Sequence, residues 1–171
     1  MSSIIQFLKI RKVKSPERAH LTDAGIDFYV PELNMDFIKL LQEKNPTIYI
    51  TKEGIILYPQ QRILIPSGIH CQMQNYDRCL IAFNKSGIAS KLGLIVGSCV
   101  VDSDYQGEIH LSLINTSNKP IKITSGMKIL QFIEIPIFNS HIIMEERKTL
   151  GEFYKKETTR GNKGFGSTDK K

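Results

Sequence analysis

The sequence predicts an all-β fold of short strands with one short helix inserted among them. The chain has 171 residues, of which 41% are hydrophobic, so it is long enough for one compact domain with a core of its own. Its β-branched segments are short, regularly spaced and separated by Gly, Pro, Asn and Ser. This pattern is typical of jelly rolls, sandwiches and barrels. We therefore expect a jelly-roll-like β-barrel or sandwich.

Eight segments have the composition of strands, with Ile, Leu, Val or Phe at most positions and a turn-forming residue nearby. In chain order they are Ile4–Ile10, Ile48–Thr51, Ile55–Tyr58, Arg62–Ile65, Cys79–Phe83, Ile109–Ile114, Ile121–Thr124 and Ile129–Ile135. No internal repeat and no linker divides them. A single β domain over residues 1–156 is expected.

The helix is predicted over Met35–Lys44. Asn34 precedes this segment as an N-cap, and Asn45-Pro46 ends it. Its apolar residues fall on one face: Phe37, Ile38, Leu40 and Leu41. We interpret the surrounding stretch, about 32–57, as an insertion into the β domain. Such an insertion could present a surface to a partner protein.

Composition argues against several classes of protein. The apolar stretch Leu92–Val101 is broken by Gly and Ser and falls short of the roughly 20 residues that a membrane span needs. Neither a signal peptide nor membrane binding is expected, so the chain should act in the cytoplasm, or in the nucleus if the source is eukaryotic or viral. The cysteines Cys71, Cys79 and Cys99 form no CxxC pair, and the scattered histidines argue against a zinc site.

The net charge of +6 is concentrated at the C-terminal end of the sequence. Between Lys155 and Lys171, six basic residues stand against two acidic ones. Residues 157–171 are rich in Gly, Ser and Thr and are expected to be mobile when nothing is bound. Basic residues confined to one tail, without interleaved aromatics, do not indicate stable nucleic-acid binding.

Within this tail, the residue types suit a nucleotide. Arg160, Ser167 and Thr168 offer donors for phosphate oxygens, and Gly166 lets the backbone approach a ligand. Phe165 could stack on a base. A solvated, disordered end explains the same composition equally well.

The block Val100–Glu108 is a second candidate. Asp102 directly follows Val100-Val101, and a carboxylate at a strand end suits a general base or a ligand of metal-bound water. Tyr105 could pack on a sugar. Because Asp and Gly also form plain turns, the block is equally consistent with a hairpin that pairs Val100-Val101 with the strand from Ile109.

Three further segments are weak when taken singly. Lys85-Ser86-Gly87 offers a cation, a hydroxyl and backbone N–H groups in a turn after a strand. Ala24–Asp27 is a small-residue turn that ends in a carboxylate, and Ser125-Gly126 is a turn that leads into Met127–Gln131. Ser86 lies in no GxSxG motif, and nothing activates Cys99, so a covalent nucleophile is not indicated.

Taken together and in order, the five segments resemble the five motifs of the trimeric dUTPase family. The corresponding segments are Ala24–Asp27, Lys85–Ala89, Val101–Glu108, Gly126–Gln131 and Arg160–Thr168. The third and fifth are the most specific. The resemblance implies a jelly-roll-like homotrimer whose sites are shared between subunits. It also implies a Mg²⁺-assisted hydrolase that converts dUTP to dUMP and pyrophosphate, which limits uracil in DNA and supplies dUMP for dTMP synthesis.

The resemblance also implies roles for individual residues. Asp102 would be the catalytic carboxylate that activates the attacking water, and Asp27 would hold the hydrated Mg²⁺ through water. Uracil and deoxyribose would be contacted by Gly97, Ser98, Cys99, Val100, Val101, Tyr105 and Phe165. The phosphates would be contacted by Lys85, Ser86, Gly87, Gln131, Arg160, Gly166, Ser167 and Thr168.

Several positions depart from the family's pattern. Lys85 stands where the family usually has Arg, and Asn84 where it usually has Pro. Lys128 replaces a usual Arg, and Cys99 a usual Gly. Two alternatives stay open: a bifunctional dCTP deaminase and dUTPase on the same fold, and a dUTPase-like regulatory protein that binds a partner through the insertion.

Overall fold

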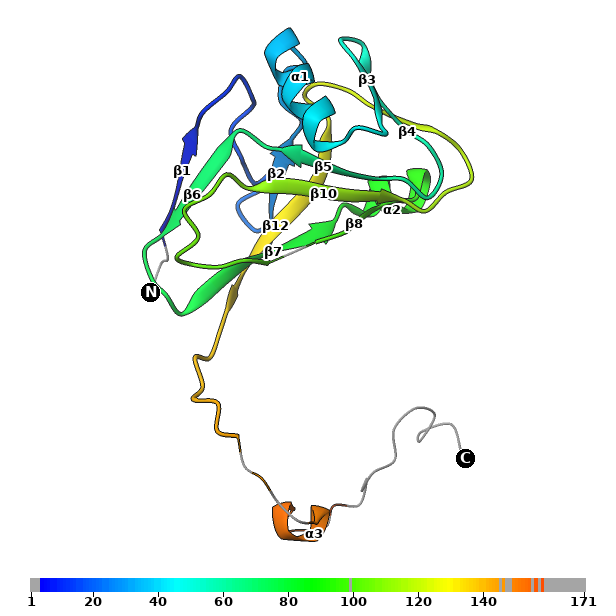
Figure 1. The fold of residues 1–171 in the computed structure, drawn as a ribbon. Helices are drawn as coiled ribbons and strands as arrows, with labels where there is room; N and C mark the ends of the chain where they lie inside the picture. The colour runs from blue at the N-terminus through cyan, green and yellow to red at the C-terminus, as the bar shows by residue number, and fades with distance from the viewer. Residues whose placement is uncertain are drawn as a thin grey trace. The chain divides into compact units, whose positions relative to one another are not determined.

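The computed structural model describes residues 4–98, 100–144, 146, 149–154, 156 and 158. The chain divides into two units, Met1–Phe138 and Asn139–Lys171 (Figure 1). The described part of the first unit contains twelve strands: β1 (Ile5–Lys9), β2 (Gly25–Tyr29), β3 (Tyr49–Thr51), β4 (Gly54–Leu57), β5 (Arg62–Pro66), β6 (Ile69–Met73), β7 (Arg78–Asn84), β8 (Leu94–Val96), β9 (Val100–Val101), β10 (His110–Asn115), β11 (Ile121–Ile123) and β12 (Lys128–Pro136). It also contains helices α1 (Met35–Lys44) and α2 (Ser86–Leu92).

The strands pair antiparallel in four sheets, with the orders β1-β6, β5-β10-β8, β11-β4-β3 and β2-β12-β7-β9. The largest sheet is centred on β12, which pairs with β2 on one side and with β7 on the other. The all-β, jelly-roll-like prediction is confirmed. The sheets stay open, so the barrel form of that prediction is not what the described strands adopt.

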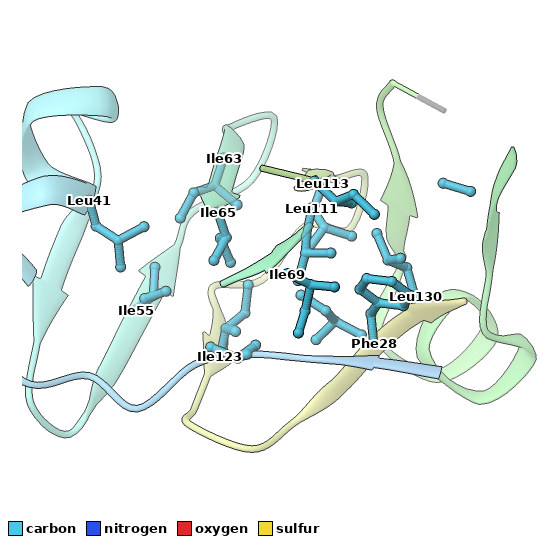
Figure 2. Close-up of a cluster of buried hydrophobic side chains, with 14 of the residues drawn as sticks. Phe28, Leu41, Ile55, Ile63, Ile65, Ile69, Leu111, Leu113, Ile123 and Leu130 are labelled. Carbon is cyan, nitrogen blue, oxygen red and sulfur yellow. The ribbon is translucent and has the colours of Figure 1, made fainter. Parts of the chain in front are cut away.

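One apolar core joins the sheets and the first helix. Figure 2 shows part of it, with Phe28 of β2, Ile55 of β4 and Leu111 of β10 among the labelled side chains. The rings of Phe28 and Phe132 meet edge to face with centroids 4.7 Å apart, a geometry that aromatic pairs favour. The face of β12 that carries Phe132 therefore contributes to the core. Gln131 is only half-buried.

Helix α1 forms as predicted, with both boundaries correct. The Asn34 side chain accepts a hydrogen bond from the Phe37 N–H at 2.9 Å, and Phe37, Ile38 and Leu41 are buried. Just after the helix, the buried Asn45 side chain donates to the Leu64 carbonyl at 3.0 Å and accepts from the Leu64 N–H at 2.9 Å. These bonds fasten the insertion to β5, and its apolar face packs on the core of this same chain.

Three local predictions are wrong. Ala24–Asp27 is not a free turn, because Gly25–Tyr29 forms β2 and every residue of that strand is buried. The turn predicted at Lys85-Ser86-Gly87 begins α2 instead. The predicted hairpin does not form between β9 and β10, since β9 pairs with β7 while β10 pairs with β5 and β8.

The described part of the second unit contains α3 (Leu150–Phe153). Thr149 and Glu152 cap it reciprocally, with the Glu152 carboxylate accepting from the Thr149 N–H at 2.9 Å. The predicted tail over residues 157–171 lies outside the described residues apart from Thr158. Among the residues that the structure describes, no helix reaches the length and apolar character that a bilayer crossing requires.

Candidate active site

The first part of the candidate site is a fork between two strands. Strands β8 and β10 pair as far as Gly97, whose N–H donates to the Ser112 carbonyl at 2.9 Å. Beyond that point the segment after Gly97 and the start of β10 separate. Val101 pairs with Leu80 of β7, whereas His110 lies opposite Pro66 of β5. Two strands that part in this way leave a space between them.

That space is a hollow of about 250 Å³, which we call the fork pocket. Its lining residues are Ser98, Val100, Val101, Tyr105, Glu108, Ile109, His110 and Phe132. The volume is below the roughly 300–1,000 Å³ of pockets that hold drug-sized ligands, so it suits a nucleoside moiety better than a whole nucleotide triphosphate. Four residues predicted to contact uracil or deoxyribose (Ser98, Val100, Val101 and Tyr105) thus meet in one pocket.

Gly97 lies at the entrance of the fork and borders a neighbouring hollow of about 520 Å³ beside the end of α1. Ser98 lines both hollows. Cys99 lies outside the described residues. His110 and Phe132 were missed by sequence reasoning, although the alternation along β10 could have placed His110 on the face that carries Ser112 and Ile114.

Tyr105 is held against the loop that enters β10. Its hydroxyl donates to the Glu108 carbonyl at 3.2 Å, and the end of its ring lies where a side chain at Gly107 would stand. Gly107 is therefore needed for this close approach. The ring remains 44% exposed, so one side of it is available to a ligand.

Further contacts anchor the same loop. The Glu108 carboxylate accepts from Arg11 Nη2 at 2.7 Å and from the Gly68 N–H at 2.6 Å. His70 Nδ1 lies 3.0 Å from the Gln106 carbonyl oxygen, and His110 Nδ1 lies 2.8 Å from the Glu108 carbonyl oxygen. These contacts fix the backbone that carries Tyr105.

Asp102 directly follows β9 and is exposed. Its carbonyl accepts from the Tyr105 N–H at 3.2 Å, which closes a turn and keeps the two residues together. Burial and, after it, the Asp102 charge raise the pKa of the Cys79 thiol. A raised pKa leaves less thiolate, so Cys79 is a structural residue rather than a nucleophile.

The second part of the candidate site is a cluster of Asp27, Lys85 and Lys128, which we call the lysine cluster. Asp27 of β2 is 3% exposed. One carboxylate oxygen is bound by the Lys85 ammonium, and the other lies 3.0 Å from Lys128 Nζ. Burial alone would raise the pKa of Asp27, but hydrogen bonds from the two lysines outweigh it and hold that pKa below its ordinary value. The cluster therefore joins the first, second and fourth motif segments.

Gln131 lies beside this cluster. It is the residue of β12 opposite Asp27, and its side chain packs on Gly25, where a Cβ would collide with it. Its amide donates to the Asn84 carbonyl at 3.0 Å, while the Asn84 side chain accepts from the Val96 N–H at 2.7 Å. The amide thus lies near the start of α2, whose first residues are Ser86 and Gly87.

Magnesium was predicted to contact Asp27 through water. Among the described residues, no group of three or more His, Cys, Asp or Glu side chains could hold a metal ion. Both oxygens of Asp27 already contact lysines. These residues do not fit a resident metal site.

The structure brings the predicted residues together in two separate sets. None of the lysine-cluster side chains is among the lining of the fork pocket. The tail residues Arg160, Phe165, Gly166, Ser167 and Thr168 lie outside the described residues.

Comparisons with known proteins identify the family. The family model described as dUTPase matches residues 47–169. The chain is 35% identical to the deoxyuridine 5'-triphosphate nucleotidohydrolase of Pseudomonas entomophila, over 68% of this chain and 74% of that protein. It is 39% identical to the enzyme of the same name from Wolbachia pipientis, over 68% of this chain and 73% of that protein.

Solved structures show the same fold. The dUTPase of Staphylococcus bacteriophage 80alpha, in a mutant form with dUpNHpp, superimposes with a TM-score of 0.71 over 96% of this chain and 97% of that chain, at 21% identity. A dUTPase mutant from phage phi11 of S. aureus, described with a structural Mg(II) ion, gives a TM-score of 0.65 at 18% identity over 85% and 99% of the two chains. The chain is therefore an antiparallel β protein with the dUTPase fold. Given the family model and the curated relatives, this chain belongs to the dUTPase family.

Proposed function

We propose that this chain is a dUTP diphosphatase, which hydrolyses dUTP to dUMP and pyrophosphate. Such an enzyme limits uracil incorporation into DNA and supplies dUMP for dTMP synthesis, in the cytoplasm or the nucleus. The observation that carries the proposal is the fork pocket, whose lining includes Tyr105 and Val101, with Asp102 next along the chain. Membership of the dUTPase family supports it.

In this proposal the nucleoside enters the fork. Two separated strands expose backbone donors and acceptors toward the space between them, as an edge strand does. The segment Gly97–Val101 reads the uracil edge, and Tyr105 packs on the deoxyribose and leaves no room for a 2′-hydroxyl. A pocket of about 250 Å³ favours a pyrimidine over a purine.

Asp102 acts as the general base in this mechanism. Its exposed carboxylate at the strand end can take a proton from a water molecule that attacks the α-phosphorus. The new P–O bond forms as the bond to the pyrophosphate oxygen breaks. Since no covalent intermediate is needed, catalysis depends on position and on neutralising phosphate charge.

The phosphates are neutralised by the second set of residues. Lys85 and Lys128 supply positive charge, and the Asp27 carboxylate fixes the position of both. Ser86, Gly87 and Gln131 add neutral donors beside them. The tail residues Arg160, Gly166, Ser167 and Thr168 bind the terminal phosphate, and Phe165 stacks on the uracil as the tail closes.

Any Mg²⁺ would be brought by the substrate rather than held by a resident site among the described residues. Mg²⁺ binds mainly to substrate phosphates and keeps several waters, and it would neutralise phosphate charge when bound. The described residues offer it no set of direct ligands, so a contact with Asp27 would run through water.

A homotrimer brings the two sets of residues together. The lysine cluster does not line the fork pocket of its own chain. A complete site would therefore combine the fork pocket of one subunit with the lysine cluster of a second and the tail of a third.

The alternatives have less support. The regulatory hypothesis depended on the insertion, but Phe37, Ile38 and Leu41 of α1 are buried against the core of this chain. That face is not available to a partner protein. A bifunctional deaminase is distinguished by release of ammonia from dCTP.

The test is pyrophosphate release from each deoxynucleoside triphosphate with Mg²⁺, for the wild type and for Asp102→Asn. We expect turnover of dUTP alone and a loss of at least about a hundredfold in kcat for the variant, because loss of a general base typically costs 10²–10⁴-fold. Asp36→Asn is the matched control, since Asp36 is an exposed carboxylate on α1. A wild type that binds dUTP without releasing pyrophosphate, or an active Asp102→Asn, would contradict the proposal.

A further inference from the structure

Glu108 joins two sets of contacts, one through its backbone carbonyl and one through its side chain. The carbonyl accepts a hydrogen bond from the Tyr105 hydroxyl at 3.2 Å, and His110 Nδ1 lies 2.8 Å from the same oxygen. The carboxylate accepts from Arg11 and from the Gly68 N–H, which belong to other parts of the chain. The contacts that hold the Glu108 side chain therefore also affect where the Tyr105 ring lies.

The Glu108 carboxylate is bound by three donors. Arg11 Nε lies 3.2 Å from one oxygen and Arg11 Nη2 lies 2.7 Å from the other, so the ion pair is bidentate. The Gly68 N–H donates to the first of these oxygens at 2.6 Å. The side chains of Arg11 and Glu108 are only 21% and 15% exposed, so salt screens the pair weakly. Because bidentate, charge-assisted bonds are strong and directional, they fix the orientation of the Glu108 side chain.

The position of Arg11 is set in turn by two other segments. Its guanidinium carbon lies 5.0 Å from the centre of the Phe37 ring, which is buried on α1. A guanidinium can stack on an aromatic face while it still donates its hydrogen bonds. Gly68 has a φ of +76°, and a Cβ there would lie 2.3 Å from Arg11 Cγ, so a glycine is needed for this side chain to pass. A line of contacts thus runs from the insertion through Arg11 and Glu108 to Tyr105.

We propose that Arg11 and Glu108 are positioning residues that hold Tyr105 in the orientation that rejects a 2′-hydroxyl. This inference rests on the proposed function, in which Tyr105 packs on the deoxyribose. The Tyr105 ring is 44% exposed, so packing alone does not hold it. In an enzyme site, a misplacement of about 1 Å can cost roughly a hundredfold in rate. Rejection of a group as small as a hydroxyl therefore requires that the ring stay in place, which its bond to the anchored Glu108 backbone provides.

Two variants disturb this line of contacts at different points. Glu108→Ala removes the carboxylate and its three bonds, while the backbone carbonyl stays. Arg11→Met removes the guanidinium but keeps an unbranched side chain over Phe37, and a backbone N–H still binds the carboxylate. The matched control is Glu134→Ala. The Glu134 side chain is also 15% exposed and lies 3.4 Å from Arg78 in an ion pair, but it lines a different hollow.

The experiment measures kcat/KM for dUTP and for UTP in each variant, with thermal unfolding to confirm that the variant folds. The preference for dUTP over UTP should fall about tenfold in Glu108→Ala and about threefold in Arg11→Met, because a displaced ring makes room for the 2′-hydroxyl. Glu134→Ala should keep the wild-type preference within about twofold, since it lies in a separate set of contacts. When the ring is absent, in Tyr105→Ala, the further change Glu108→Ala should alter the preference by less than about twofold.

Three results would overturn the inference. It fails if Glu108→Ala folds and keeps the wild-type preference, if Glu134→Ala loses as much preference as Glu108→Ala, or if Glu108→Ala lowers the preference as strongly without the Tyr105 ring as with it. Arg11→Met takes the place of Glu108→Ala if that variant does not fold. A wild type inactive on dUTP would overturn the proposed function and this inference with it, whereas an active wild type with an unchanged preference in both variants contradicts this inference alone.

Discussion

The fork pocket and the lysine cluster differ in what their contacts offer a ligand. In the fork pocket, the Tyr105 bond to the Glu108 carbonyl and the Arg11–Glu108 ion pair on the same loop set a shape. In the lysine cluster, a nearly buried carboxylate organises two ammonium groups. Shape-based contacts discriminate between ligands and depend little on salt, whereas charge gives attraction that ions screen. Base selectivity should therefore be determined by the fork pocket and phosphate affinity by the lysine cluster.

The largest effect on folding is expected at Asp27. Asp27→Asn leaves two ammonium groups facing each other around a neutral amide in a poorly hydrated place. Removing one partner of a buried pair costs about 3–5 kcal/mol, and the partial exposure of both lysines reduces this to about 2 kcal/mol. Urea unfolding at neutral pH measures it. Asp36→Asn should change the free energy of unfolding by less than about 1 kcal/mol, the usual limit for a charge in the first turn of a helix, and an equal loss in both variants would contradict the assignment.

The same residue predicts an acid dependence. Because the lysines lower the pKa of Asp27 in the folded chain, the unfolded chain takes up this proton first as pH falls. The stabilisation is complete above the unfolded pKa of about 3.9 and is lost as pH falls through the lower, folded value. The stability gap between the wild type and Asp27→Asn should therefore be constant from pH 7 to 5 and shrink below about pH 4. If the stability difference between the two proteins instead grows below pH 4, the pKa of Asp27 is raised in the folded chain and the assignment is wrong.

A smaller effect is expected on binding at Lys85. Lys85→Gln removes one positive charge from the lysine cluster and leaves the fork pocket intact. We expect KM for dUTP to rise about tenfold and its dependence on KCl to become shallower, while inhibition by deoxyuridine stays unchanged. Lys39→Gln, on the exposed side of α1, is the control. If Lys85→Gln weakens deoxyuridine and dUTP equally, the two regions are not separate.

The two regions also differ in how far the sequence could predict them. Most residues of both sets were predicted, because each motif segment carries its residue types in a short run, but His110 and Phe132 of the fork pocket and Lys128 of the lysine cluster were not. The pairing between distant segments was not predicted from the sequence. Lys128 and Asp27 lie about a hundred residues apart, and only the register of β12 against β2 brings them together. No local pattern in either segment indicates that partner.

The errors in the fold have similar causes. Helix α1 was predictable because Asn34 and Asn45-Pro46 mark its ends. Helix α2 is only seven residues long and has no side-chain cap, and its apolar residues Ile88 and Leu92 pack only partly buried against the core, so its signal in the sequence is weak. Strand β2 is buried at all five positions, so it lacks the alternation that identifies strands. The fork was missed because hairpin rules pair neighbouring strands, whereas β9 pairs with β7.

The smallest effect is expected at Gly107, and it tests the shape of the fork pocket alone. A methyl group there would collide with the end of the Tyr105 ring, and the ring can move aside because it is partly exposed. Gly107→Ala should therefore leave stability nearly unchanged, raise KM for dUTP about three- to fivefold and weaken rejection of UTP. Gly151→Ala, where no atom lies within 4 Å of the added carbon, is the control. The dependence of KM on KCl should stay as in the wild type, in contrast to Lys85→Gln. A change in that dependence would show that displacing Tyr105 also disturbs phosphate binding, and the division between shape and charge would fail.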